Sequence, residues 1–102
     1  MSAIHAAIHP LTEQARVLGP ALLAGVTSPH DECLAMVWGP RFDREHGLEL
    51  ISRQSSAVVY PLPTILKMLK VLADQFDGLA APEQHRLRRL ILRHRAWRAV
   101  AM

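Results

Sequence analysis

The sequence predicts a mainly α-helical fold in one small domain. A length of 102 residues suits one domain and leaves no room for two, so we assign residues 1–102 to a single unit. Half of the residues are hydrophobic and 21% are charged, which is typical of globular proteins and not of disordered ones. Near the C-terminus, residues 62–76 and 82–99 repeat apolar side chains at helical spacing.

The N-terminal part predicts a helix that proline interrupts. Pro10 suits the first turn of a helix, so we expect residues 1–9 to be loosely ordered and the helix to begin at Pro10. Proline inside a helix removes a backbone donor, and we therefore expect a break at Pro20. Residues 21–26 then form a short second piece.

Residues 29–38 carry signals for a helix and for a strand. Ser28 suits an N-cap, Pro29 suits the first turn, and the two acidic residues that follow suit the positive end of a helix dipole. The unbroken apolar run over residues 33–38 also suits a buried strand. We prefer the helix and leave the strand open.

A short β-hairpin is the strand feature that the sequence offers next. Residues 48–53 alternate roughly between apolar and polar side chains, and residues 57–60 are rich in strand-forming types. The two segments fit a hairpin across residues 54–56, which would add a small β element to the helical fold. Whether it forms stays open. Residues 39–47, which precede it, predict a polar loop.

The two C-terminal segments predict the clearest helices. The first begins at Pro63 or Thr64 and ends before Gly78. The second begins at Pro82. Because the connection over residues 79–81 is short, we expect an antiparallel pair of neighbouring helices. The core residues that these apolar faces predict are Leu62, Leu69, Phe76, Leu87, Ile91 and Trp97.

Positive charge is concentrated at the C-terminus. Residues 1–80 hold six basic and eight acidic side chains, whereas residues 81–102 hold six arginines and one glutamate. The basic character is therefore a property of the last helix, and it suits an acidic protein surface or a nucleic acid.

The last helix offers a candidate binding surface. Helical spacing puts Arg89 and Arg93 on one face, with Leu92 among the arginines. An apolar residue framed by arginine is typical of protein interfaces, whereas a solvated face and a row of phosphate contacts are the alternatives. Val71 lies on the polar side of the preceding helix. The candidate partner-binding residues are Val71, Arg88, Arg89, Leu92, Arg93 and Arg95.

We recognise no catalytic motif and no ligand spacing for a metal or a cofactor, so the sequence predicts a non-enzymatic protein. His30 stands three residues before Cys33, but a nucleophile also needs an orienting group, and we expect an inert thiol. A single cysteine excludes an intrachain disulfide and suits a reducing compartment.

The sequence also argues against a membrane or secreted protein. The longest apolar stretch, residues 17–26, is about half of a membrane span. Residues 1–10 lack the basic start of a secretory signal. We therefore expect a cytoplasmic protein.

Short length, a single cysteine and an abundance of Leu, Ala, Arg and His accompany the amphipathic segments at residues 62–76 and 87–97. In these features the chain resembles the small proteobacterial quorum-sensing antiactivators, which bind LuxR-type transcription factors. The resemblance implies a cytoplasmic, cofactor-free inhibitor and a homodimer. We predict a regulatory protein that sequesters a transcriptional regulator. A nucleic-acid-binding protein that uses the arginine-rich helix is the alternative.

Overall fold

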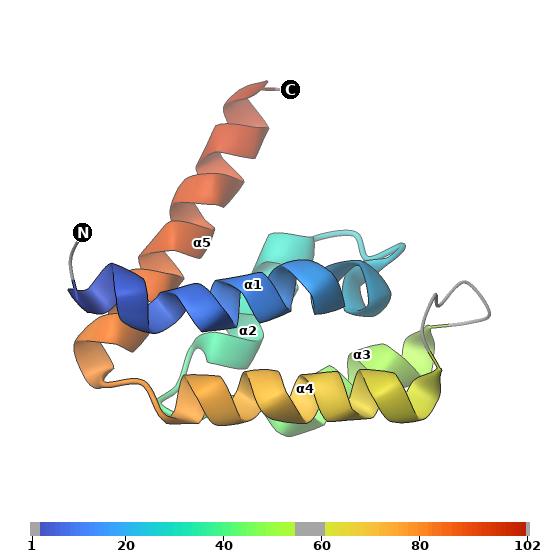
Figure 1. Ribbon diagram of the computed structural model, residues 1–102. Helices are drawn as coiled ribbons and strands as arrows, with labels where there is room; N and C mark the ends of the chain where they lie inside the picture. The colour runs from blue at the N-terminus through green and yellow to red at the C-terminus, as the bar shows by residue number, and fades with distance from the viewer. Residues whose placement is uncertain (1–2, 55–60, 102) are drawn as a thin grey trace.

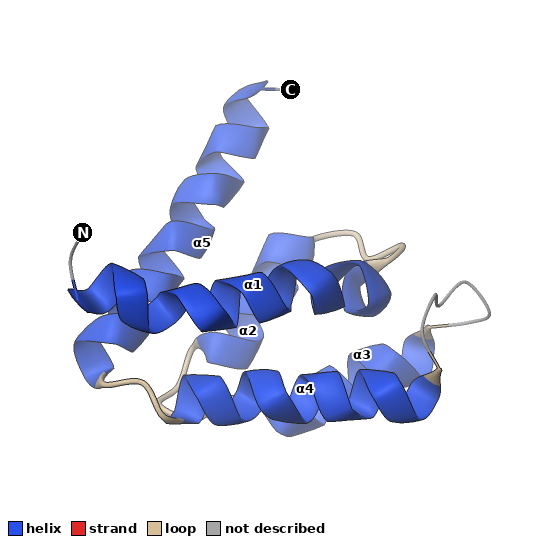
Figure 2. Cartoon of the chain, viewed as in Figure 1, coloured by secondary structure: helices blue, strands red, loops and turns tan. Residues whose placement is uncertain are grey.

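The fold is helical throughout the part of the chain that the structure describes. The computed structural model describes residues 3–54 and 61–101, and no strand occurs among them (Figure 2). The predicted mainly α fold is confirmed. α1 and α4 lie antiparallel side by side, and α5 rises steeply from the end of α4 (Figure 1). The helices are α1 (Ala3–Leu23), α2 (Pro29–Val37), α3 (Arg44–Arg53), α4 (Leu62–Asp77) and α5 (Ala81–Ala101).

α1 is one helix that contains both Pro10 and Pro20. It begins at Ala3, so the predicted start at Pro10 and the predicted break at Pro20 are wrong. It also covers most of residues 1–9, which we expected to be loosely ordered. Each proline costs a backbone hydrogen bond, but burial of an apolar face along the helix offsets that loss. The buried residues of this face are Ile8, Leu11, Leu18 and Leu22.

α2 confirms the helix that we preferred for this segment. It follows Ser28 and begins at Pro29, although the Ser28 side chain makes no capping hydrogen bond. Two acidic residues occupy the first turn, where the helix dipole favours negative charge. The inner face buries Leu34, Met36 and Val37.

α3 occupies the segment that we predicted as loop and strand. Asp43 caps its N-terminus by accepting a hydrogen bond from the backbone N–H of His46 at 3.1 Å. The helix continues through residues 48–53, so the first strand of the predicted hairpin is wrong. Residues 55–60, which would hold the second strand, lie outside the described residues. Helical spacing places Gly47, Leu50 and Ile51 together on the face that packs in the core. In a strand, the neighbouring side chains of Leu50 and Ile51 would point to opposite faces.

α4 matches its prediction, but the helix that pairs with α5 differs from the expected one. α4 ends at Asp77, with Gly78 as its C-cap, and its apolar face packs against α1 and α3. α5 packs against α1 and α2 and projects beyond them (Figure 1). The expected antiparallel pairing of α5 with α4 is therefore incorrect, because the apolar face of α4 is already covered.

The core contains most of the residues that the sequence predicted for it. Leu62 is the exception, because it lies in the first turn of α4 with 56% of its surface exposed. Trp97 lies outside the residues whose side chains are described. The remaining predicted residues join the core cluster: Leu69, Phe76 and Leu87 are buried, and Ile91 is partly buried.

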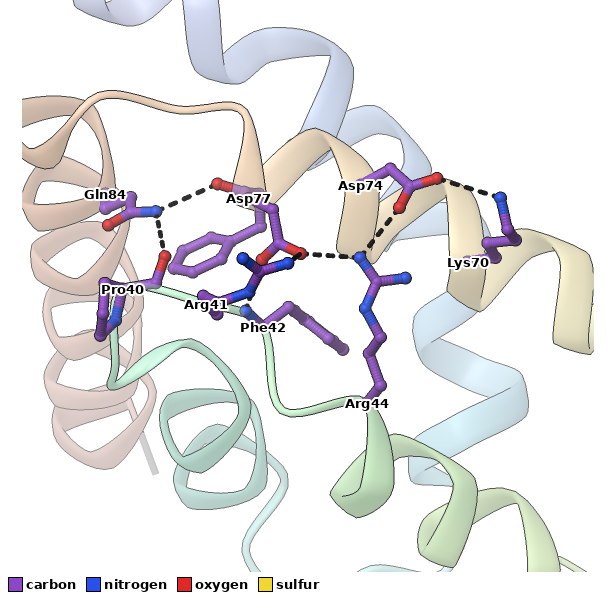
Figure 3. A network of polar contacts seen from close by, with 9 residues as sticks. Pro40, Arg41, Phe42, Arg44, Lys70, Asp74, Asp77 and Gln84 are labelled. Atoms are coloured by element: carbon purple, nitrogen blue, oxygen red, sulfur yellow. Dashed lines mark hydrogen bonds and ion pairs between the residues drawn. The ribbon is translucent and has the colours of Figure 1, made fainter.

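A polar network fixes the turn between α2 and α3 against α4 (Figure 3). The Asp77 carboxylate accepts hydrogen bonds at 2.7 Å from the backbone N–H of Phe42 and from the guanidinium of Arg44. Arg44 also donates to Asp74 at 2.9 Å. The network therefore holds Phe42 in place, with its ring in the core.

Gln84 joins the start of α5 to the same region (Figure 3). Its side chain is buried, and its amide donates to the carbonyl oxygens of Pro40 at 2.8 Å and Phe76 at 3.1 Å. A buried amide with satisfied donors fixes geometry at little cost. These hydrogen bonds fix the start of α5 against the end of α4 and the turn after α2.

Candidate functional site

A deep apolar groove lies between α1, α2 and α5. Its volume is about 850 Å³, within the range of small-molecule binding sites. The groove reaches the core, since Phe42, Leu72 and Leu87 line it although none is more than 7% exposed. The other apolar lining residues are Leu11, Ala15, Met36, Val37, Leu90 and Ile91.

The charged side chains that line the groove are basic. Arg16 comes from α1 and Arg93 from α5, and no carboxylate is among the described lining residues. Arg16 is 78% exposed and pairs with Glu13 at 3.2 Å, an exposed contact that contributes little stability. Arg93 makes no ion pair or hydrogen bond within the described part of the chain. The groove therefore combines an apolar interior with positive charge at its mouth.

Two histidines from different helices meet beside this groove. His30 Nε2 of α2 lies 2.7 Å from His94 Nδ1 of α5, and both residues line the groove. A hydrogen bond between two imidazoles needs one ring as donor and the other as acceptor. The contact therefore ties α5 to α2 while at least one ring is neutral.

Cys33 lines the groove as a protonated thiol. Burial raises the pKa of this thiol, and the negative charge of Glu32 raises it further. A thiol that stays protonated is a poor nucleophile. Among the described residues, no group of three or more His, Cys, Asp or Glu is placed to hold a metal ion.

α5 and α2 form an antiparallel pair held by arginine. At the C-terminal end of α2, Arg88 donates to the carbonyl oxygens of Val37 at 2.6 Å and Gly39 at 2.9 Å. At the N-terminal end, Arg95 Nε lies 3.3 Å from a carboxylate oxygen of Asp31. Arg88 and Arg95, which we predicted to bind a partner, thus also contact α2 within their own chain.

The remaining candidate residues divide into two groups. Arg89, Leu92 and Arg93 lie together on the exposed side of α5, which we call the outer face. Leu92 is 44% exposed, and neither arginine makes an ion pair or hydrogen bond within the described residues. Val71 is exposed in the middle of α4, and α5 leaves the end of α4 at a steep angle (Figure 1). Val71 is therefore separate from the outer face.

The sequence did not predict the groove. Residues of α1, α2 and α5 line it together with Phe42 and Leu72, and these segments meet only when α5 packs against α1 and α2. One local sign was present: the small Ala15 interrupts the large apolar side chains of α1 between Leu11 and Leu18. A small residue in such a face leaves room beside it.

Comparisons with known proteins add no relative. No protein-family model matches the chain, and no significant match is found among curated proteins or solved structures. None of the described helices combines the length and the apolar character that a membrane crossing requires.

Proposed function

We propose that the protein is a non-enzymatic regulator that binds an acidic surface of another protein through the outer face of α5. The observation that carries the proposal is Leu92, 44% exposed and flanked by Arg89 and Arg93. Interfaces commonly place an apolar residue at the centre and enrich arginine around it. All three residues of this face are exposed, so a partner can reach them.

Charge supports an acidic partner. The last 22 residues hold six arginines against one glutamate, and a concentrated positive field speeds encounter with a negative surface. The likeness to antiactivators suggests that the partner is a transcriptional regulator, held away from its promoter or from its own dimer. Cytoplasmic action follows from the same likeness.

Nucleic acid is the weaker candidate. Arg88 and Arg95 are engaged with α2, so fewer arginines of α5 are free to follow a phosphate backbone. The outer face also has Leu92 at its centre, where a phosphate-binding face would gain nothing from an apolar side chain.

The test uses two charge-matched variants in affinity capture from the native cell extract. The first changes Arg89→Gln and Arg93→Gln on the outer face. The second changes Lys67→Gln and Lys70→Gln, which removes the same charge from exposed positions of α4. We expect the first variant to lose the partner and the second to keep it, because only the first lies at the proposed interface.

The captured partner is then purified and its DNA binding is measured with and without the protein. We expect the wild type to reduce that binding and the outer-face variant to leave it unchanged. Equal capture by both variants would contradict the proposal. Tight binding of the wild type to duplex DNA at about 150 mM salt would favour the nucleic-acid alternative.

A further inference from the structure

We infer that the groove between α1, α2 and α5 is a binding site for a single-chain anionic amphiphile, such as a long-chain carboxylate. The inference rests on the interior of the groove and on its mouth, where Arg93 is shared with the outer face of α5, whereas Arg16 and the apolar lining belong to the groove alone. It assigns hydrocarbon to the interior and an anionic head group to the mouth.

The shape of the groove favours a slender ligand over a helix. Phe42, Leu72 and Leu87 line it while being at most 7% exposed, so the groove penetrates between the helices and is not a shallow trough. A helix with its side chains is about 10–12 Å across and docks on exposed apolar residues. A hydrocarbon chain is narrow enough to reach buried ones.

The chemistry of the lining selects hydrocarbon for the interior. Apolar side chains from all three helices surround it, including Leu11 of α1, Met36 of α2 and Ile91 of α5. Unfilled apolar space weakens packing, because the atoms around it lose their contacts. A hydrocarbon chain would restore those contacts, and the volume of about 850 Å³ can hold one.

The charge of the lining selects an anion for the head group. Arg16 and Arg93 are the described charged residues that line the groove, and they belong to helices on different sides of it. Arginine binds carboxylate and phosphate groups through paired donors. Thr12, His30 and His94 also line the groove, where the Thr12 hydroxyl donates to the carbonyl oxygen of His9 and the two imidazoles contact each other. A cationic head group would meet like charge there.

The test compares probes that share a chain and differ in the head group. Dodecanoate and dodecyltrimethylammonium are titrated into the full chain below their micelle concentrations, and binding is followed by calorimetry. We expect dodecanoate to saturate at one molecule per chain and to bind at least tenfold more tightly than dodecyltrimethylammonium. In the series octanoate, decanoate and dodecanoate, each added pair of methylene groups should improve affinity by about tenfold.

Two kinds of variant locate the site. Arg16→Gln with Arg93→Gln should weaken dodecanoate by at least about threefold and leave dodecyltrimethylammonium no weaker. Ala15→Trp should fill the groove and remove binding, whereas Ala35→Trp, at an exposed position of α2, should not. If Ala15→Trp fails to fold by circular dichroism, Leu90→Glu replaces it, and it should repel dodecanoate from the groove.

Several outcomes would overturn the inference. Nonspecific surfactant association would be indicated by equal affinity for the two head groups, by affinity that does not rise with chain length, or by binding that does not saturate. Unchanged dodecanoate binding in the folded groove variant would place the ligand elsewhere. If dodecanoate does not bind, and an acidic amphipathic peptide binds in a way that Ala15→Trp abolishes, the groove would be assigned to a protein helix.

Discussion

Arg88 of α5 donates from Nε to the carbonyl oxygen of Val37 at 2.6 Å, and a second donor reaches Gly39 at 2.9 Å. The last carbonyl groups of a helix have no partner within the helix, so an arginine there satisfies them and suits the helix dipole. The pair closes the C-terminal end of α2 and fixes the position of α5. Because α5 forms one side of the groove, this contact helps to set the width of the groove.

Arg88→Ala should therefore destabilise the protein by about 1–3 kcal/mol, since it removes two charged hydrogen bonds to partly buried carbonyl groups. Arg89→Ala, one position along the same helix, should change stability by less than about 0.5 kcal/mol because its side chain is exposed. Urea denaturation of both variants measures the difference. If both variants lowered the free energy of unfolding equally, the hydrogen bonds of Arg88 to Val37 and Gly39 would not contribute to stability.

The sequence predicted those elements whose signals are local. α2 could be predicted from its first-turn proline and acidic first turn, and α4 from its first-turn proline and apolar period. These signals depend on neighbouring residues only. The roles of Arg88 and Arg95 could not be predicted in this way. Arg88 contacts a carbonyl group 51 residues earlier in the chain, and no local pattern distinguishes it from the exposed Arg89.

α3 illustrates the other limit of sequence reasoning. The alternation of apolar and polar residues over 48–53 resembles a strand, but the segment is helical because the helix buries its apolar residues in the core. As a helix, this segment turns Leu50 and Ile51 inward and brings Gly47 against α4. The groove could not be predicted from the sequence either, because it forms only when α5 packs against α1 and α2.

Gly47 should tolerate no side chain. A Cβ atom added there would lie 2.9 Å from one methyl carbon of Leu69 and 3.1 Å from the other, and Leu69 is itself packed in the core. We expect Gly47→Ala to destabilise the protein by about 1–3 kcal/mol, despite the higher helix propensity of alanine.

The control is Gly19→Ala in α1, where, its two chain neighbours aside, no side chain lies within 4 Å of an added Cβ. Alanine has the higher helix propensity there, but its Cβ also meets the ring of Pro20, which disfavours helical backbone at the preceding residue, so the two effects oppose each other and stability should change by less than about 1 kcal/mol. The thermal unfolding temperature should therefore fall clearly for Gly47→Ala and change little for Gly19→Ala. Changes of equal size would mean that α3 and α4 are not in close contact at Gly47.

Asp77 should make stability depend on acid pH. Burial opposes ionisation of this carboxyl, but hydrogen bonds from Phe42 and Arg44 outweigh it, so its pKa lies below the ordinary value. A carboxyl with a lowered pKa in the folded state stabilises the fold above its unfolded pKa of about 4, and loses that contribution as the pH falls through its folded pKa.

We therefore expect stability to fall below about pH 4 and to fall less steeply in Asp77→Asn. Glu45→Gln is the control, because Glu45 is an exposed carboxyl that makes no ion pair within the described residues. Urea denaturation between about pH 3 and pH 7 gives the three curves. Parallel curves for the wild type and Asp77→Asn would exclude Asp77 as a source of the acid sensitivity.

The outer face of α5 also bears on self-association, since we expect the protein to form a homodimer with two-fold symmetry. Leu92 is exposed, and two copies meeting there would bury it against its symmetry mate. The same contact would bring Arg89 and Arg93 of both copies together, and their repulsion weakens as salt rises.

Light scattering at micromolar concentration should therefore give twice the mass of the chain, with the dimer fraction increasing from low to high salt. Leu92→Arg should abolish the dimer at every salt concentration, because it removes the apolar contact and adds charge. Val71→Arg is the control, since Val71 lies on α4 and apart from the outer face. A monomer under all conditions would leave the outer face to an acidic partner alone, whereas a dimer that only Val71→Arg disrupts would move the interface to α4.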